Sequence, residues 1–448
     1  TGRYNWVSMT QLGALLCGVC WPQFQRAEIW RDRSLARLVQ NANGSLYPDG
    51  VQKELTASYH MVSLGRYQFA ANLLDQAGIE PPKGFAAILR KMWAYTARIM
   101  RPSGTLPLNN DSDLFDHRPD LREMAERYKE PEWLYVASNG AQGRKPADPP
   151  SRVLPWARQL ISRSGWGATA QWSFFDFGPA GAGHHHGDHG HLSIQTGGRD
   201  LLVDSGRFAY QGKLAKAFLK PYARHTRGHN TILIDGRGQR CAPREFRKPA
   251  EEGQDFVVGP AFDFARAAWS NYDGVRGRVT HRRSVVYMRG RGWVVVDRVR
   301  TDRPRTIDVL WHFHPDCETA VGGKAVTAAL EDGPGLRVLP VGDAAWSLRV
   351  FKGRREPTPQ GWYSERYNRH EPASCAVYRT KIDTTVTFAW VLWPKGNAGE
   401  GVAAVMAGAS RPVPIVHVML SNGEKASVGV PVGKGAPSVE WEAAEGKK

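Results

Sequence analysis

The spacing of apolar residues divides the chain into two parts. In residues 1 to about 140, apolar side chains recur with the helical period, and Ile88, Met92, Tyr95 and Ile99 would line one face of a helix. A second set with nearly this spacing is Trp30, Leu35, Leu38 and Val39. Breaks rich in proline and glycine separate such segments, so we expect about six helices packed as antiparallel pairs.

From about residue 158 onward the pattern changes to short runs of β-branched and aromatic residues between glycine, aspartate and arginine turns. The clearest runs are residues 284–288, 293–296, 307–313 and 386–393. No helical segment of comparable strength interrupts them, which predicts a large antiparallel β region. Two stacked sheets would bury the apolar faces of so many strands.

A polar, proline-rich segment, GAQGRKPADPPSRVLP, lies between the two parts at residues 140–155. Such composition is typical of a linker. We therefore expect a helical domain over residues 1–145 and a β domain over residues 156–448.

Composition and net charge limit the classes of molecule that the protein is expected to bind. The 448 residues are 42% apolar, which is ample for the cores of two or three domains. The net charge of +17 favours a polyanion such as nucleic acid, anionic lipid or acidic polysaccharide. Nucleic acid is disfavoured because the chain has no zinc-finger spacing, P-loop, RNA-binding aromatic motif or concentrated basic helix. The longest apolar run is too short to span a membrane, so we expect no membrane insertion. A start at Thr1 without a secretory signal indicates a processed chain or a fragment.

The five cysteines, at positions 17, 20, 241, 317 and 375, are too few for a disulfide-rich scaffold and odd in number. Cys17 and Cys20 have the spacing of a redox motif. They lie in an apolar run without a preceding strand, so we expect them to be buried in a core.

Potential metal ligands and acid/base groups concentrate in residues 184–235. Six of them lie on the glycine-rich loop GPAGAGHHHGDHG and directly after it: His184, His185, His186, Asp188, His189 and His191. The alternating run 192–203 then predicts a half-buried strand that ends at Asp204, and His229 opens a second strand that closes at an Asp-Gly turn. Two adjacent strands could bring His186, Asp204 and His229 together. Three such ligands with a position left open are typical of a catalytic zinc site.

Four motifs occur in an order that resembles the heparinase II/III-like polysaccharide lyases. They are PDGVQKELTASYH at residues 48–60, HHHGDHGHLSIQTGGRDLLVDSGRFAY at 184–210, RGHNTILIDGRGQ at 227–239 and GWYSERYNRHEP at 361–372. The resemblance implies an (α/α) toroid, here incomplete, followed by an antiparallel β-sandwich. It also implies a periplasmic or secreted enzyme that cleaves a uronic-acid polysaccharide by β-elimination, with alginate and glycosaminoglycans as candidate substrates.

Residue roles follow from the same resemblance. In β-elimination, a base removes the weakly acidic proton beside the uronate carboxylate and an acid protonates the departing oxygen, while the charge on the carboxylate must be neutralised. The resemblance assigns neutralisation to Asn5 and acid/base catalysis to Tyr59 and His184, with Tyr222 as a further acid/base candidate. It assigns one divalent ion, expected to be zinc, to His186, Asp204 and His229.

Two other interpretations remain open. His184, His186, Asp188 and His189 fit H-x-H-x-D-H, the dinuclear zinc motif of metallo-β-lactamase-like hydrolases. That motif follows a strand and opens a helix in an alternating fold, whereas here a helical part precedes it and strands follow. The second interpretation is a protein that binds acidic glycans through its basic surface without cleaving them.

Overall fold

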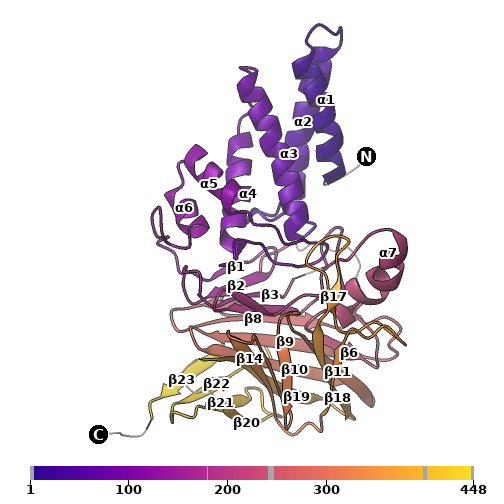
Figure 1. Ribbon diagram of the computed structural model, residues 1–448, viewed down its shortest axis with the longest axis vertical. Coiled ribbons are helices and arrows are strands. Elements are labelled where there is room, and N and C mark those ends of the chain that lie inside the picture. The colour runs from indigo at the N-terminus through magenta and orange to yellow at the C-terminus, as the bar shows by residue number, and fades with distance from the viewer. Residues whose placement is uncertain (1–4, 179, 241–246, 397–400, 445–448) are drawn as a thin grey trace.

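The computed structural model describes residues 5–178, 180–240, 247–396 and 401–444. Helices form one end of the molecule and layers of β-sheet form the other (Figure 1). The helices of the N-terminal part are α1 (Asn5–Cys20), α2 (Ala27–Ser45), α3 (Ala57–Gln76), α4 (Phe85–Ile99), α5 (Arg118–Arg127) and α6 (Pro131–Ala137).

The apolar spacing predicted α4 correctly. Met92, Tyr95 and Ile99 are buried on the face that packs in the helical core, with Ile88 at its edge. In α2, Leu35 and Leu38 are buried as well, whereas Trp30 is 38% exposed. Trp30 lies near the turn that joins α1 and α2, where it contacts the ring of Phe24 instead of the core.

The helices pack directly on a sheet of five antiparallel strands. These are β1 (Arg152–Leu154), β2 (Gln159–Arg163), β3 (Trp172–Asp176), β4 (Leu192–Thr196) and β5 (Arg199–Leu202). Ile161 and Trp172 join the helical core, while Leu160 and Phe175 face the opposite side. The sheet is therefore buried on both faces, and β1 begins inside the segment that composition predicts as a linker.

An eight-stranded antiparallel sheet forms the next layer. Its strands are β7 (Phe256–Val258), β8 (Phe262–Trp269), β9 (Val279–Met288), β10 (Gly292–Thr301), β12 (Glu318–Gly322), β13 (Ala325–Ala329), β14 (Gly335–Val341) and β19 (Val386–Lys395). Val285 and Val295 face the core shared with the first sheet, and their neighbours Val286 and Val294 face a second core on the other side.

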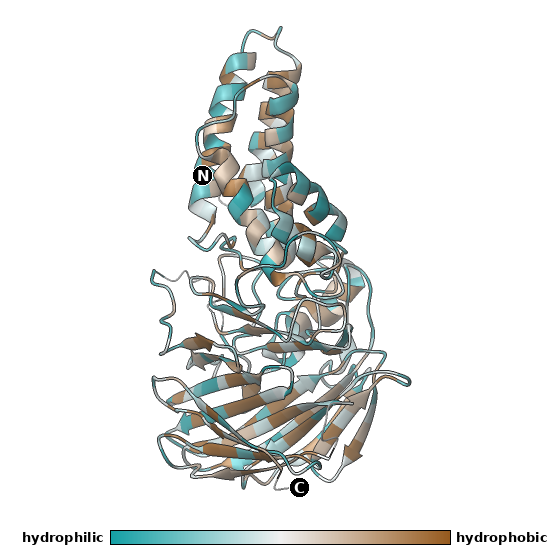
Figure 2. Ribbon diagram, turned by 90° about the vertical axis from the view of Figure 1, so that its left-hand side faces the viewer, coloured by the Kyte–Doolittle hydropathy of each residue, from teal (hydrophilic) through white to brown (hydrophobic). Residues whose placement is uncertain are grey.

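That second core is covered by a four-stranded sheet of β20 (Ala403–Ala407), β21 (Ile415–Met419), β22 (Lys425–Gly429) and β23 (Ser438–Glu442). The prediction of two stacked sheets is therefore wrong in number. Because β9 and β10 carry apolar residues on both faces, a further sheet is needed to remove the second face from water. In Figure 2, apolar segments recur along the strands of the β part.

The remaining strands flank the site. A sheet in the order β15-β18-β11-β6 comprises β15 (Ser347–Lys352), β18 (Ser374–Ile382), β11 (Arg305–His312) and β6 (Ile232–Ile234). The short strands β16 (Trp362–Tyr363) and β17 (Glu371–Pro372) form a hairpin, and α7 (Gly212–Phe218) lies beside them. The predicted fold class, a helical part followed by a large antiparallel β-sandwich, is confirmed.

Two local predictions are corrected. The run 192–203 is a hairpin of β4 and β5 and not one strand, because Gly197 and Gly198 have positive φ values of 61° and 75° and reverse the chain. Cys17 and Cys20 are exposed, because α1 packs through only one side, which includes Leu15 and Gly18. Cys241 lies outside the described residues. Within the described ranges, the helices are too short or too polar to cross a membrane.

Candidate active site

The glycine-rich histidine loop joins β3 to β4 and lies against the start of α3. The Ala182 amide donates to the carbonyl oxygen of Lys53 at 2.9 Å. Gly181 has a φ of 61°, and a Cβ at this position would lie 2.6 Å from the carbonyl oxygen of Glu54. Only glycine permits this approach. The loop therefore brings the three consecutive histidines from the β part next to Tyr59, in the first turn of α3.

The first cluster centres on His184, whose backbone adopts the left-handed conformation with a φ of 55°. The ring of Tyr59 stacks on it, with ring centroids 3.5 Å apart. On the other edge, Asn5 Nδ2 lies 3.4 Å from His184 Nε2. A strained backbone at a non-glycine residue is a feature of functional sites. Asn5, Tyr59 and His184, three of the four residues predicted to be catalytic, are therefore neighbours, although Asn5 and His184 are 179 positions apart in the sequence.

Tyr210 joins this cluster, although no pattern in the sequence assigned it to the site. Its hydroxyl lies 2.9 Å from the Tyr59 hydroxyl and 3.4 Å from His184 Nδ1. Arg207 donates to the Tyr210 oxygen at 3.0 Å and is itself held by Asp113 at 2.8 Å. Burial and the charge of Asp111 raise the pKa of Tyr210, which keeps the phenol protonated. In the sequence, Tyr210 is marked only by its place six residues after Asp204, at the end of the motif at residues 184–210.

Tyr222 does not belong to the site, and the prediction of a catalytic role for it is corrected. Its side chain is completely buried. The hydroxyl donates to the carbonyl oxygen of Trp362 at 3.1 Å and accepts from the Trp362 amide at 3.2 Å. It packs in a small apolar cluster with Phe208 and Phe218, so it cannot reach a substrate.

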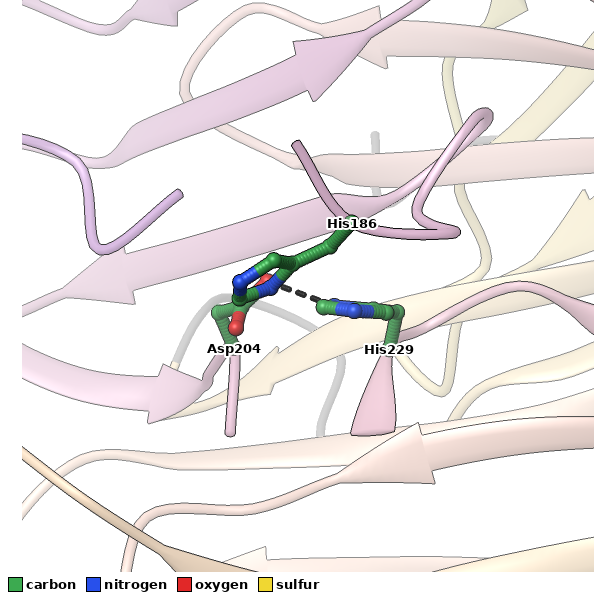
Figure 3. Close-up of side chains that lie close together, drawn as sticks. All are labelled: His186, Asp204 and His229. Carbon is green, nitrogen blue, oxygen red and sulfur yellow. Dashed lines mark hydrogen bonds and ion pairs between the residues drawn. The ribbon is translucent and has the colours of Figure 1, made fainter. Parts of the chain in front are cut away.

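The second cluster is the trio predicted to bind metal. His186, Asp204 and His229 each offer one ligand atom, and these atoms lie within 4.8 Å of one another (Figure 3). All three side chains are buried. His186 comes from the histidine loop, Asp204 follows β5, and His229 precedes β6. His229 Nδ1 donates to the Asp204 carboxylate at 2.8 Å, the contact drawn in Figure 3.

The donor set fits a divalent cation. His186 Nδ1 and His229 Nε2 are buried and have no hydrogen-bond partner among the described residues. Burying such atoms without a partner is costly, and a metal ion would satisfy both. Burial alone would raise the pKa of Asp204, but His229, which donates a hydrogen bond to it, and the neighbouring His191 hold this pKa below its usual value. An ionised carboxylate with two imidazole nitrogens matches the ligand preference of zinc.

Asp111 connects the two clusters and was not found from the sequence. It lies in the loop between α4 and α5 and is buried. Burial would raise its pKa, but hydrogen bonds from His184 and His186 and the charge of Arg224 hold the pKa of Asp111 far below its usual value. In the sequence, Asp111 is marked only by its place in a polar run, NNDSD, at residues 109–113.

A cavity of about 450 Å³ opens beside the histidines. It is lined by His184, His185, His186, Arg224, Gln239, Arg240 and Asp273. Two arginines against one aspartate make its wall cationic, which favours a negatively charged ligand.

The hydrolase motif does not form a dinuclear centre. His189 Nδ1 is bonded to the Gly178 carbonyl oxygen, and its Nε2 lies 3.1 Å from that of Ala268. Among the residues that the structure describes, the one group arranged for a metal takes only His186 from that motif. The interpretation as a metallo-β-lactamase-like hydrolase is therefore not supported.

A helical part above stacked antiparallel sheets, with an Asn-Tyr-His cluster where they meet, is the architecture that the sequence motifs imply. The family described as heparinase II/III-like, C-terminal, matches residues 163–391, and the heparinase II/III N-terminus matches residues 1–135. The chain belongs to the heparinase II/III-like family.

Curated relatives are heparin-sulfate lyases. That of Bacteroides stercoris is 23% identical over 86% of this chain and 56% of its own length. That of Pedobacter heparinus is 25% identical over 76% of this chain and 51% of its own length. The chain thus spans about half the length of the curated relatives it matches.

Solved structures show the same fold. The heparan sulfate lyase HepC of Pedobacter heparinus superposes with a TM-score of 0.78 at 22% identity, covering 94% of this chain and 65% of its own. A heparinase III gene product superposes with a TM-score of 0.82 at 21% identity, covering 96% and 66%.

Proposed function

We propose that the protein is a polysaccharide lyase that cleaves a uronic-acid-containing glycosaminoglycan by β-elimination. The observation that carries the proposal is the convergence of Asn5, Tyr59, Tyr210 and His184 at the junction of the helices and the sheets. These side chains supply an amide, two phenols and an imidazole, which are the groups that the reaction needs. The curated relatives named heparin-sulfate lyase favour a heparan-type substrate over alginate.

Asn5 is the residue proposed to neutralise the substrate carboxylate. Its backbone carbonyl accepts from Arg66 at 2.5 Å and from Ser8 at 2.7 Å, which fixes the start of α1. The side-chain amide can then donate to the uronate and stabilise the enolate-like charge that develops in the transition state. Burial raises the pKa of the neighbouring Glu54, although the hydrogen bond from Gln52 opposes this shift. A neutral Glu54 would repel the uronate less.

Tyr59 is the proposed acid/base residue. Arg207 donates to the Tyr210 oxygen, so the Tyr210 hydroxyl is free to donate its own proton to the Tyr59 oxygen. As the phenolate, the Tyr59 oxygen would take the proton beside the carboxylate and become a phenol, while the carbon–oxygen bond to the leaving sugar breaks. The Tyr59 phenol would then give that proton to the departing oxygen and return to the phenolate, and a conjugated double bond remains in the new end sugar.

The metal proposal concerns His186, Asp204 and His229, which would hold one zinc ion. The two unpartnered ring nitrogens support it. When bound, the ion would supply charge that ties the histidine loop to β5 and β6 and so fixes the position of His184. A periplasmic or secreted location stays a prediction.

The test is incubation with a panel of heparan sulfate, heparin, hyaluronan and alginate, monitored by ultraviolet absorbance. Elimination creates a conjugated, unsaturated uronate that absorbs, and hydrolysis does not. We expect an absorbance increase with heparan sulfate. If no polymer gives absorbance while heparan sulfate still binds, the chain is a non-catalytic glycan-binding protein, and the proposed lyase function is wrong.

A further inference from the structure

Asp111 contacts both clusters of the site through its two carboxylate oxygens. His186 Nε2 lies 2.9 Å from Oδ1, whereas His184 Nδ1 lies 3.0 Å from Oδ2. Arg224 also donates to Oδ2, at 2.8 Å. The backbone reinforces the arrangement, because the Asp111 amide donates to the His184 carbonyl oxygen and Asn110 Oδ1 accepts from the His186 amide at 2.7 Å.

These contacts determine where each imidazole carries its proton. A carboxylate beside a guanidinium is ionised and only accepts hydrogen bonds. Each histidine must therefore donate from the nitrogen that faces Asp111. His184 is protonated on Nδ1 and His186 on Nε2.

The opposite nitrogen of each ring therefore carries a lone pair. These two nitrogens lie in different clusters of the site. His184 Nε2 lies beside Asn5 Nδ2, in the proposed catalytic cluster. His186 Nδ1 is buried without a partner among the described residues and belongs to the group with Asp204 and His229.

We propose that Asp111 is a positioning residue that selects the tautomers of His184 and His186 together, and so couples the metal cluster to the catalytic cluster. Its effect on His184 rests on the proposed function, whereas its effect on His186 concerns metal binding alone. A carboxylate that orients a metal-ligating histidine contributes about 10- to 100-fold to metal affinity or activity.

The test compares Asp111→Asn with Asp113→Asn. Asparagine keeps the shape of Asp111 but replaces one carboxylate oxygen by an NH2 group, so one of the two histidine N–H groups would face a donor instead of an acceptor. Asp113 is a matched control for zinc binding, since it is two positions away, largely buried, and paired with Arg207 instead of a histidine. Zinc affinity is measured by competition with a chromophoric chelator, and ring tautomers by nitrogen-15 NMR of histidine-labelled protein.

We expect Asp111→Asn to weaken zinc binding by about 10- to 100-fold, to change the tautomer of at least one of the two histidines, and to lower kcat more than it changes KM. Asp113→Asn should keep the parental zinc affinity. Parental zinc affinity and tautomers in Asp111→Asn would overturn the proposal, as would an equal loss in both variants. The zinc and NMR measurements need no substrate, so they remain decisive even if the protein cleaves no polysaccharide.

Discussion

Two buried ionic networks lie within the β part, and they differ in how completely their polar atoms are bonded. In the sheet core, Arg283 forms two hydrogen bonds to Asp297, and its remaining terminal nitrogen donates to the carbonyl oxygens of Gly190 and Asn230. Asp297 also accepts from His281 and Trp390. In the site, by contrast, His186 and His229 each keep one unpartnered buried nitrogen among the described residues.

The difference separates a structural network from a ligand site. A buried polar network stabilises a fold when every member is bonded, and an unbonded member is costly. The Arg283 network also supports the site indirectly, because Gly190 ends the histidine loop and Asn230 follows His229. The fully bonded network around Arg283, here called the closed network, thus holds the backbone of the group of His186, Asp204 and His229, here called the open network.

The largest expected effect comes from opening the closed network. Asp297→Asn leaves the buried Arg283 charge without its counter-ion, and we expect a loss of roughly 3–5 kcal/mol in the free energy of unfolding, measured with denaturant. Because Arg283 and its bonds to the carbonyl oxygens of Gly190 and Asn230 remain in the variant, its zinc content when folded should match the parent. A stability equal to that of the parent would contradict the structural assignment.

The stability difference between the parent and Asp297→Asn should also depend on pH. Burial would raise the pKa of Asp297, but the charge of Arg283 and the bond from His281 hold it below its usual value. The carboxylate therefore contributes stability above its unfolded pKa of about 4, and this contribution is lost as pH falls toward the lower folded value. The stability gap between parent and variant should be constant from pH 5 to 7 and shrink below about pH 4.

The second-largest effect is expected from removing a metal ligand of the open network. His229→Ala should lose bound zinc, and with zinc at roughly 100 to 1,000 times its dissociation constant this removes about 2.7–4.1 kcal/mol of stability. Addition of a chelator should destabilise the parent and leave the variant nearly unchanged. His189→Gln is the matched control, because the nitrogens of His189 contact backbone carbonyls and not the cluster. Zinc loss from the control and retention by His229→Ala would reverse the assignment.

Two tyrosines allow the same comparison for catalysis. Tyr59→Phe removes a hydroxyl proposed to move the proton, so kcat should fall by about 10²-fold or more with KM little changed. Tyr222→Phe removes a hydroxyl bonded to the backbone of Trp362, so it should keep kcat and lose about 1 kcal/mol of stability. Steady-state kinetics and thermal unfolding measure both. If Tyr59→Phe keeps the parental kcat, Tyr210 and His184 become the acid/base candidates.

The smallest expected effect is that of salt on glycan binding, which reflects the charge of the whole surface instead of one residue. The net charge of +17 and the arginines of the cavity should make binding of heparan sulfate weaken steeply as ionic strength rises. Retention on immobilised heparin across a salt gradient measures this. Retention that does not change with salt would show that binding does not depend on the cationic surface.

The sequence alone determined features that repeat along the chain or stand in a motif. The helical period of α4 and the apolar runs of β9, β10, β11 and β19 predicted element types correctly, since periodicity reports which faces are buried. The motif order also identified the family, and it named His186, Asp204 and His229 before any distance was known.

Only the tertiary structure decided which chemically similar residues meet. Tyr222 and Tyr210 belong to the same segment, yet packing buries one among phenylalanines and places the other 2.9 Å from Tyr59. Asp111 comes from a helix connection with no recognisable motif, and it reaches two histidines more than 70 positions away. Contacts over such separations depend on how the layers stack, and no local pattern of residues encodes that stacking.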